Sequence, residues 1–296
     1  MNGRLIPWDE ARVHILTHAL HYGTGVFEGI RCYETERGPA IFRLMDHLRR
    51  LTDSSKIYLI KIPYTEQQLT DAIIQTVKAN ELKGCYIRPI AYFGYGEMAL
   101  EPLNNPVDVA IAAFHLVTYF GEEGLRQGVR CKVSSWCRLD PRVLPPLAKA
   151  TANYLNSALA KVEALQAGCD EAIFLTTSGT VSEGSGENIF IVKNQELITP
   201  WVGAGPLQGI TMASVKEIAK DLGMRVVERE ILREELYLAE EAFLTGTAAE
   251  VTPIREIDGR IIGNGTRGPF TEKLQAAFFD IVHGKNATYL KWLTYI

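Results

Sequence analysis

Short apolar runs alternate along this chain with stretches whose apolar residues recur at helical spacing, and this alternation most limits the fold. The runs at Val26 to Glu34 and Tyr86 to Phe93 are rich in β-branched and aromatic residues, which favour strands. Between them, Leu69, Ile73 and Val77 recur at the spacing of one helical face. We therefore predict an α/β protein, in the broad sense that includes α+β, and exclude all-helical and all-β folds.

Further runs extend this alternation over the whole length. The same criteria predict helices over residues 43–58, 148–166 and 270–281, and strands over 107–117, 129–136, 171–177, 187–192, 225–230 and 241–245. Gly121, Gly124 and Gly128 fall among charged residues between two of these strands, which indicates a linker. We expect two mixed α/β domains: a small one over residues 1–118, a linker over 119–128 and a larger one over 129–296.

Composition excludes several classes of protein. Of 296 residues, 47% are hydrophobic, so the chain is not disordered. The 31 Lys and Arg against 35 Asp and Glu exclude binding to nucleic acid through bulk charge. No apolar run approaches the roughly 20 residues of a membrane span, and the opening lacks the apolar core of a signal peptide. With five cysteines and no C-x-x-C pair, the sequence predicts a cytoplasmic protein with reduced thiols.

Common phosphate and nucleophile motifs are missing from the sequence. Gly23-Thr24-Gly25, Gly94-Tyr95-Gly96 and Gly184-Ser185-Gly186 each lack the third glycine of a dinucleotide-binding loop. No P-loop and no G-x-S-x-G sequence occurs either. A nicotinamide-dependent dehydrogenase or a P-loop enzyme is therefore not expected.

Three histidines, His14, His18 and His21, are spaced to share one helical face. Metalloprotease chemistry would need Glu at position 15, where the chain has Ile15. We therefore expect hydrogen-bonding histidines and no metal site. A zinc-binding module remains the alternative from a different functional class.

Two segments carry a side chain with catalytic potential. Lys149 follows Pro145-Pro146 and lies among small and apolar neighbours, where loss of hydration can make a lysine a nucleophilic amine. The alternative is a lysine whose stem covers apolar surface while its ammonium reaches water. Glu183 precedes a glycine-rich turn and could pair with a heterocyclic nitrogen, or it could belong to an ordinary hairpin.

Two later segments offer donors for an anion. Gly209 enters a helix whose first turn contains Thr211, so backbone N–H groups and a hydroxyl lie together. Thr245 to Ala249 places small residues after a strand and presents similar groups. Capping and turn formation explain either segment equally well when it is taken alone.

Taken together and in this order, the four segments resemble the class IV pyridoxal-phosphate aminotransferases, most closely the branched-chain amino acid aminotransferases. Matching sequence extends from about Asn2 to about Gly284. It includes the stretches His18 to Thr24, Val26 to Arg31, Leu48 to Leu51 and Tyr86 to Pro89. The resemblance implies two α/β domains of the class IV type, with the larger C-terminal domain binding the cofactor and the site in the interdomain cleft.

The resemblance also implies roles in holding pyridoxal 5'-phosphate. Lys149 would form the internal aldimine, Glu183 would face the pyridine nitrogen, and Tyr154 would bind the phenolic oxygen. The phosphate would contact Arg50 by charge and Ile210, Thr211 and Thr247 through N–H or hydroxyl donors. Gly186 and Asn188 complete the cofactor-binding residues that the resemblance implies.

By the same resemblance, Phe27, Tyr119 and Tyr154 would line an aromatic substrate pocket, with Gly29 beside it. Tyr86 and the backbone around Thr247 and Ala248 would bind the α-carboxylate, and Arg88 with Tyr119 would bind the distal carboxylate of glutamate. Tyr22, Met98 and Leu100 would come from a neighbouring subunit, which implies a homodimer or an assembly of dimers. Leu116 and Thr151-Ala152 depart from the family pattern and leave the size of the pocket open.

The implied reaction is transamination between branched-chain L-amino acids (Leu, Ile, Val) and 2-oxoglutarate, which gives branched 2-oxo acids and L-glutamate. The D-amino-acid aminotransferases and aminodeoxychorismate lyases share the fold and remain alternatives. The sequences Tyr86-Ile87-Arg88 and Gly246-Thr247-Ala248-Ala249 favour the L-specific branched-chain type.

Overall fold

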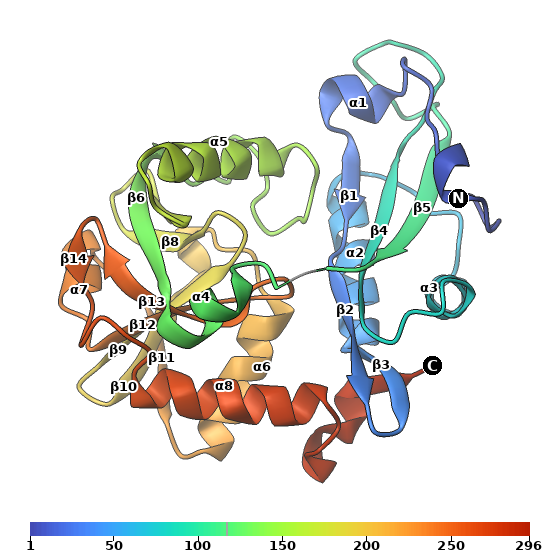
Figure 1. The fold of residues 1–296 in the computed structure, drawn as a ribbon. Helices are drawn as coiled ribbons and strands as arrows, with labels where there is room; N and C mark the ends of the chain where they lie inside the picture. The colour runs from blue at the N-terminus through green and yellow to red at the C-terminus, as the bar shows by residue number, and fades with distance from the viewer. Residues whose placement is uncertain (117) are drawn as a thin grey trace. The chain divides into compact units, whose positions relative to one another are not determined.

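The computed structural model describes residues 1–116 and 118–296, and contacts between residues divide them into two compact units. The first unit contains Met1–Leu116, Ala148–Tyr154 and Val282–Ile296; the second contains residues 118–147 and Leu155–Ile281. This division differs from the predicted domains, because two later segments of the chain return to the first unit. Figure 1 shows the helices and strands of each unit.

The first unit is built on a six-stranded antiparallel sheet with the order β1-β4-β2-β3-β15, and β5 also pairs with β4. Its strands are β1 (Gly25–Phe27), β2 (Ile30–Thr35), β3 (Gly38–Phe42), β4 (Cys85–Phe93), β5 (Val107–Phe114) and β15 (Leu293–Tyr295). The strand predicted at Tyr86 to Phe93 is confirmed as β4. The strand predicted over 107–117 ends at Phe114 in the structure, and Val117 lies outside the described residues.

The single strand predicted from Val26 to Glu34 is wrong, since it is interrupted between β1 and β2 at Glu28 and Gly29. Here the buried Glu28 carboxylate accepts a hydrogen bond of 3.2 Å from the Gly29 N–H. The Gly29 N–H is thus bonded to a side chain and not to a neighbouring strand, and the strand pairing stops here. This interruption positions several residues described below.

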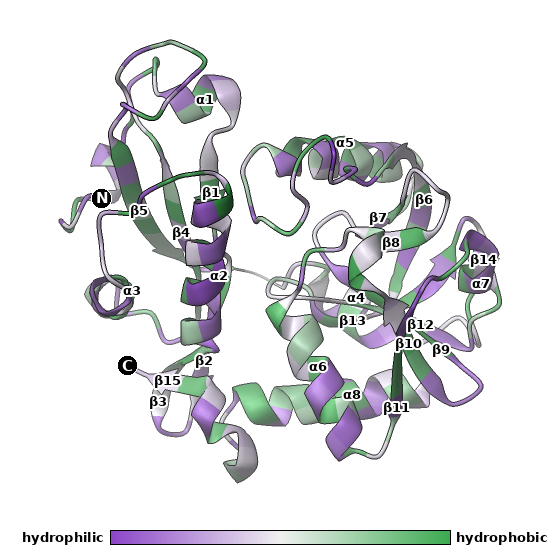
Figure 2. Cartoon of the chain, turned by 180° about the vertical axis from the view of Figure 1, so that it is seen from behind, coloured by the Kyte–Doolittle hydropathy of each residue, from purple (hydrophilic) through white to green (hydrophobic). Residues whose placement is uncertain are grey.

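Helices α1 (His18–Tyr22), α2 (Leu44–Ile57) and α3 (Glu66–Ala79) accompany this sheet, with 3₁₀ turns at Trp8–Glu10 and Ala287–Trp292. α3 begins after Thr65, which forms a capping box with Gln68, so the predicted helix is confirmed. α2 turns Leu44, Leu48 and Leu51 into the core of the unit. Figure 2 shows hydrophilic and hydrophobic residues alternating along α2, as its two faces require.

The second unit is built on a nine-stranded mixed sheet with the order β11-β10-β9-β12-β13-β6-β7-β8, and β14 pairs with β13. Its strands are β6 (Val129–Cys137), β7 (Glu171–Leu175), β8 (Val181–Gly184), β9 (Asn188–Lys193), β10 (Glu196–Pro200), β11 (Arg225–Arg229), β12 (Glu241–Gly246), β13 (Glu250–Ile257) and β14 (Arg260–Ile261). Its helices are α4 (Gly121–Gln127), α5 (Asn153–Gln166), α6 (Ile210–Asp221), α7 (Arg233–Tyr237) and α8 (Pro269–Val282), with a 3₁₀ turn at Val202–Ala204. Phe190 and Phe243 stack in its core with ring centroids 5.0 Å apart.

The glycine-rich segment that suggested a linker forms helix α4, which contacts β13. Gly121 and Gly128 adopt positive φ angles of 71° and 96° at its two ends. A Cβ at Gly124 would lie 2.8 Å from the Cβ of Phe120, so close packing requires glycine there. The glycines therefore reflect the geometry of a short packed helix. Among the helices of the described chain, none is both long and apolar enough to cross a membrane.

Candidate active site

Lys149 lies on an extended segment that is bonded to β1 and α2. The Phe27 N–H donates to the Lys149 carbonyl oxygen at 3.0 Å, and the Thr151 N–H donates to Gly25 at 2.9 Å. The Lys149 N–H donates to Ser54 Oγ of α2 at 3.0 Å. Helix α5 consequently begins at Asn153 and not at the predicted residue 148. The lysine backbone is fixed by the sheet of the first unit.

The Lys149 amine is surrounded by aromatic groups. Its Nζ donates a short hydrogen bond to the Tyr154 hydroxyl and lies 5.0 Å from the Phe27 ring centroid and 4.8 Å from that of Tyr154. The two rings meet edge to face with centroids 4.7 Å apart. The structure thus brings Lys149, Tyr154 and Phe27 together in the first unit. It does not show the lysine alternative in which the ammonium only reaches water.

Arg50 of α2 is held by a carboxylate that the sequence did not single out. Glu28 accepts hydrogen bonds from Arg50 Nε at 2.6 Å and from Arg50 Nη2 at 2.8 Å, and from His47 Nδ1 at 2.7 Å. Burial alone would raise the pKa of Glu28, but the Arg50 guanidinium and His47 lower it well below its usual range. Glu28 is therefore an anion, and it fixes one edge of the Arg50 guanidinium.

Tyr86 and Arg88 come from β4 on the same side of the strand. Arg88 Nη2 donates to the Tyr86 hydroxyl at 3.3 Å, and the Arg88 guanidinium carbon lies 4.8 Å from the Phe27 ring centroid. Arg88 Nε is buried without a hydrogen-bond partner among the described residues. Gly29 is required beside them, since a Cβ there would approach the Tyr86 hydroxyl to 1.9 Å. An unpaired buried donor of this kind suits an acceptor on a ligand.

Glu183 lies at the end of β8, a strand that the sequence analysis did not predict. Its carboxylate contacts Arg138 Nη2 at 2.9 Å and accepts a hydrogen bond from the Leu207 N–H at 3.0 Å. Asn188 Nδ2 donates to Glu183 at 3.2 Å and to the Leu207 carbonyl at 2.7 Å. Arg138 was missed by the sequence reasoning because nothing near it in the sequence marks its partner. The ion pair holds Glu183 as an oriented anion.

The N-terminus of α6 presents backbone donors near these residues in the second unit. Gly209 is its N-cap and supplies no side-chain hydrogen bond, and Ile210 and Thr211 follow as buried residues of the first turn. A Cβ at Gly209 would come within 2.0 Å of Asn188 Oδ1. The helix end is thus uncapped by a side chain and suited to an anion.

Thr247 and Ala248 lie in the turn between β12 and β13, and Gly186 is the exposed residue of the turn between β8 and β9, whose other residues are buried. A Cβ at Gly186 would meet no atom within 4 Å. Thr245 Oγ1 and Ser182 Oγ are buried without hydrogen-bond partners in the described chain. The second unit therefore contains a set of donors that the protein itself does not fully satisfy.

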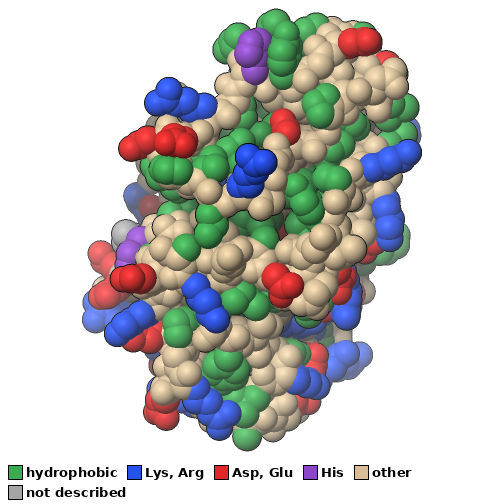
Figure 3. Space-filling view, turned by 90° about the vertical axis from the view of Figure 1, so that its right-hand side faces the viewer, with side chains coloured by type: hydrophobic (Ala, Val, Ile, Leu, Met, Phe, Trp, Pro, Cys, Tyr) green, Lys and Arg blue, Asp and Glu red, His purple; other side chains and the backbone are tan. Residues whose placement is uncertain are grey.

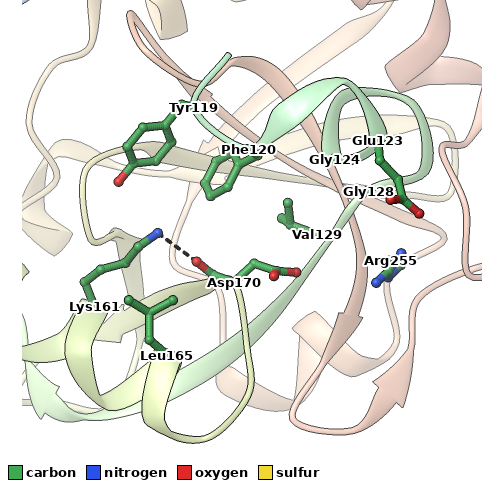
Figure 4. A pocket seen from close by; sticks show the side chains of 10 residues that line it. All are labelled: Tyr119, Phe120, Glu123, Gly124, Gly128, Val129, Lys161, Leu165, Asp170 and Arg255. Carbon is green, nitrogen blue, oxygen red and sulfur yellow. Dashed lines mark hydrogen bonds between the residues drawn. The ribbon is translucent and has the colours of Figure 1, made fainter. Parts of the chain in front are cut away.

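Tyr119 belongs to the second unit, whereas Phe27 and Tyr154 belong to the first. It lines a cavity of about 460 Å³ together with Phe120, Lys161 and Asp170 (Figure 4). Lys161 Nζ lies 5.0 Å from the centroids of both aromatic rings and donates to the Asp170 carbonyl oxygen at 2.7 Å. The predicted contact of Tyr119 with substrate stays a prediction.

The three histidines do not share a helical face, because α1 begins only at His18. His18 Nδ1 lies 2.8 Å from Thr24 Oγ1, and its Nε2 lies 3.0 Å from the Ala99 carbonyl oxygen. His21 Nε2 lies 2.8 Å from the Ile15 carbonyl oxygen, and the His14 ring stacks on Tyr95. Within the part of the chain that the structure describes, no three His, Cys, Asp or Glu side chains are grouped to hold a metal ion.

Tyr22, Met98 and Leu100 lie on or near an exposed part of the first unit. Tyr22 is 42% exposed and Leu100 is 79% exposed. Other large apolar residues on this unit are also exposed, including Trp8, Ile15 and Leu20. Figure 3 shows apolar side chains gathered beside a histidine at the top of that view. We refer to Trp8, Ile15, Leu20, Tyr22 and Leu100 together as the exposed apolar residues of the first unit.

Comparisons with known proteins agree on one family. Residues 25–257 match the family model for amino-transferase class IV. The branched-chain-amino-acid aminotransferase of Pseudomonas aeruginosa is 48% identical, over 100% of this chain and 96% of that protein. The crystal structure of the Escherichia coli branched-chain amino acid aminotransferase matches with a TM-score of 0.97 at 44% identity, over 99% of this chain and 96% of that one. The T.th. branched-chain amino acid aminotransferase with pyridoxamine 5'-phosphate matches with a TM-score of 0.96 at 47% identity, over 100% of this chain and 97% of that one.

Proposed function

This chain belongs to the class IV aminotransferases, and we propose that Lys149 is the residue at the centre of its reaction. The protein is a pyridoxal-phosphate-dependent transferase. It exchanges the amino group between leucine, isoleucine or valine and 2-oxoglutarate, and gives branched 2-oxo acids and L-glutamate. The observation that most supports Lys149 is the placement of its amine beside the Tyr154 hydroxyl and the Phe27 ring.

The residues present fit the chemistry of this cofactor. Pyridoxal 5'-phosphate offers an aldehyde, a phenolic oxygen, a ring nitrogen and a phosphate. The first unit supplies an amine, a hydroxyl and a guanidinium in Lys149, Tyr154 and Arg50. The second unit supplies an oriented carboxylate at Glu183 and an uncapped helix end at Ile210 and Thr211. When bound, the cofactor withdraws electrons from the α-carbon of an amino acid and so acidifies its C–H bond.

Each residue then has a definite task. Lys149 Nζ would hold the cofactor, and once released it would take the proton from the substrate α-carbon and deliver it to the carbon that the cofactor's aldehyde supplies, as transfer of the amino group requires. Tyr154 keeps that amine in place through its hydroxyl. Glu183, held by Arg138, binds the ring nitrogen as a hydrogen-bond acceptor. Contacts to the phosphate come from Arg50, Ile210, Thr211 and Thr247, and Gly186 and Asn188 border the ring.

Substrate binding uses groups on β4 and in the turn after β12. Tyr86 and the N–H groups around Thr247 and Ala248 bind the α-carboxylate. The unpaired Nε of Arg88 binds the distal carboxylate of glutamate, and we assign Tyr119 to the same carboxylate. Phe27 and Tyr154 provide the apolar wall for branched side chains, and Gly29 leaves room for the Tyr86 hydroxyl.

An amino-donor assay tests the function directly. The purified protein, supplied with pyridoxal 5'-phosphate and 2-oxoglutarate, should form glutamate from L-leucine, L-isoleucine and L-valine. D-Alanine should give none. It is the control that separates the two types, since a D-amino-acid aminotransferase of this fold would use it. Turnover of D-alanine without turnover of L-leucine would contradict the branched-chain assignment.

We assign a homodimer, or an assembly of dimers, to the protein in solution, and a location in the cytoplasm. The exposed apolar residues of the first unit support the assembly, since large apolar side chains that are exposed on one chain can be buried at an interface. Tyr22, Met98 and Leu100 would then complete the pocket of a neighbouring subunit. Leu20→Glu should reduce the mass measured by light scattering to that of one chain. An unchanged assembly in that variant would place the interface elsewhere.

A further inference from the structure

The Glu28 carboxylate is saturated with hydrogen bonds inside the first unit. Its Oε1 accepts from Arg50 Nε at 2.6 Å, and its Oε2 accepts from Arg50 Nη2 at 2.8 Å. Oε2 also accepts from His47 Nδ1 at 2.7 Å and from the Gly29 N–H at 3.2 Å. The Glu28 side chain is 0% exposed and that of Arg50 is 14% exposed. A carboxylate bound on both oxygens cannot rotate without breaking a buried bond.

His47 fixes this carboxylate from the adjacent turn of α2. Its side chain is 1% exposed, and burial lowers its pKa more than the Glu28 anion raises it. The imidazole is therefore neutral near pH 7, and its Nδ1–H donates to Glu28. Arg50 balances the charge of Glu28, while His47 contributes direction. One short stretch of α2 thus carries both the guanidinium and the group that orients its partner.

We propose that Glu28 and His47 are positioning residues that hold the Arg50 guanidinium in the orientation in which it binds the cofactor phosphate. This inference rests on the proposed function, in which Arg50 contacts that phosphate. A free arginine side chain samples many rotamers. Two of the N–H donors of Arg50 are fixed against Glu28, so the direction of the remaining edge is fixed as well.

Positioning and charge balance make opposite predictions for Glu28. If Glu28 only neutralised Arg50, removing its charge would strengthen the attraction of Arg50 for a phosphate dianion. If Glu28 orients Arg50, removing it weakens phosphate binding although the local charge becomes more favourable. The sign of the change in affinity therefore separates the two roles.

The test is a titration of the full-length apoprotein with pyridoxal 5'-phosphate and, separately, with pyridoxal, which lacks the phosphate. Glu28→Gln should weaken pyridoxal 5'-phosphate binding tenfold or more and leave pyridoxal binding within twofold. Glu28→Asp keeps the charge but is one methylene shorter, and it should behave like Glu28→Gln. Wild-type or tighter binding of pyridoxal 5'-phosphate by either variant would overturn the proposal.

Arg50→Ala separates this inference from the function on which it rests. We expect it to weaken pyridoxal 5'-phosphate binding selectively, as Glu28→Gln does. If Arg50→Ala is selective and Glu28→Gln is not, positioning by Glu28 is refuted and the role of Arg50 stands. If Arg50→Ala shows no selectivity for the phosphorylated compound, the assignment of Arg50 fails, and the positioning role fails with it.

A matched pair at His47 completes the design and remains usable if Glu28→Gln does not fold. His47→Asn keeps an N–H donor close to the Nδ1 position, whereas His47→Leu removes the donor. His47→Leu should weaken pyridoxal 5'-phosphate binding at least threefold, and His47→Asn should stay within twofold of wild type. Thermal unfolding of the apoproteins establishes that both variants are folded. Equal affinities for the two variants would overturn the role of His47.

Discussion

The Phe27 N–H donates a hydrogen bond of 3.0 Å to the Lys149 carbonyl oxygen, and the Phe27 ring centroid lies 5.0 Å from the Lys149 amine. Backbone and side chain of the same residue therefore both contact the lysine. The amine faces a ring whose electron-rich face favours a cation, while its own backbone extends the edge of β1. Lys149 is thereby placed by the sheet of the first unit, although it follows the first strand of the second.

Replacing the lysine tests its assignment. Lys149→Ala should abolish the visible absorption band of bound pyridoxal 5'-phosphate and lower kcat/KM for L-leucine by about a thousandfold or more, since no other amine contacts Tyr154 among the described residues. Absorption spectra and steady-state rates provide the measurement. Lys56→Ala, at an exposed lysine on α2, is the control and should retain both. A band and turnover that persist in Lys149→Ala would show that another residue holds the cofactor.

Arg88 should act on dicarboxylate substrates alone. Arg88→Ala removes the buried, unpaired Nε and should raise KM for 2-oxoglutarate about 10- to 100-fold, as expected for loss of a charge-assisted hydrogen bond. KM for L-leucine should change less than about threefold, because its side chain has no charge to bind. Arg31→Ala on β2 removes an arginine from a neighbouring strand and serves as the control. Equal losses for both substrates would contradict the role.

Gly29 should be replaceable only if Tyr86 is changed too. Gly29→Ala places a Cβ 1.9 Å from the Tyr86 hydroxyl, so the ring must move, and we expect a loss in kcat/KM of about tenfold. In a Tyr86→Phe background the hydroxyl is absent and the added cost of Gly29→Ala should be smaller. Gly84→Ala, whose Cβ would lie 3.7 Å from its nearest neighbour, is the control. Additive effects of the two substitutions would contradict the clash.

Glu187 should make stability depend on pH. Burial, and then the charge of Glu171, raise its pKa well above the ordinary value of 4.5. The folded protein therefore holds a proton that the unfolded chain releases, and its stability falls as pH rises from about 4.5 toward the folded pKa. Glu187→Gln mimics the protonated acid and removes this loss. Urea unfolding gives the free energy of unfolding of both proteins. The difference between Glu187→Gln and wild type should increase in favour of the variant by at least about 1.4 kcal/mol from pH 5 to pH 8, which is the equivalent of one pKa unit. If the free energies of unfolding of the two proteins differ by the same amount at pH 5 and at pH 8, Glu187 does not hold a buried proton.

Local signals predicted some elements of the fold well. Helix α3 has apolar residues at helical spacing and a capping box at its start, and strand β4 is a long β-branched and aromatic run. Strands β3, β8, β10, β13, β14 and β15 were not predicted. β15 is three residues long, and β13 contains Pro253, so neither has a clear pattern of its own. These strands form because they pair with neighbouring strands of the sheet, and a local sequence pattern does not reveal that pairing.

The candidate site shows the same limit. Lys149, Tyr154, Glu183 and Arg50 could be named through the family pattern, but the groups that orient them could not. Glu28 lies 22 residues from Arg50, and Arg138 contacts Glu183 from a different strand end. Such pairs are set by the tertiary fold and leave no periodic signal in the sequence. The Phe27-Glu28-Gly29 sequence was part of the family match, yet it gave no sign that Glu28 binds Arg50.

The return of the last fifteen residues to the first unit has a consequence for synthesis on the ribosome. β15 pairs with β3, and the Arg43 N–H at the start of α2 donates to the Trp292 carbonyl oxygen at 2.7 Å. The second unit, by contrast, has all its described strands by Ile261. The first unit therefore completes its sheet last, although most of it is synthesised first. The edge of β3 stays without its partner β15 while the second unit can already fold. Vectorial synthesis does not give this protein the usual order of folding from the N-terminus.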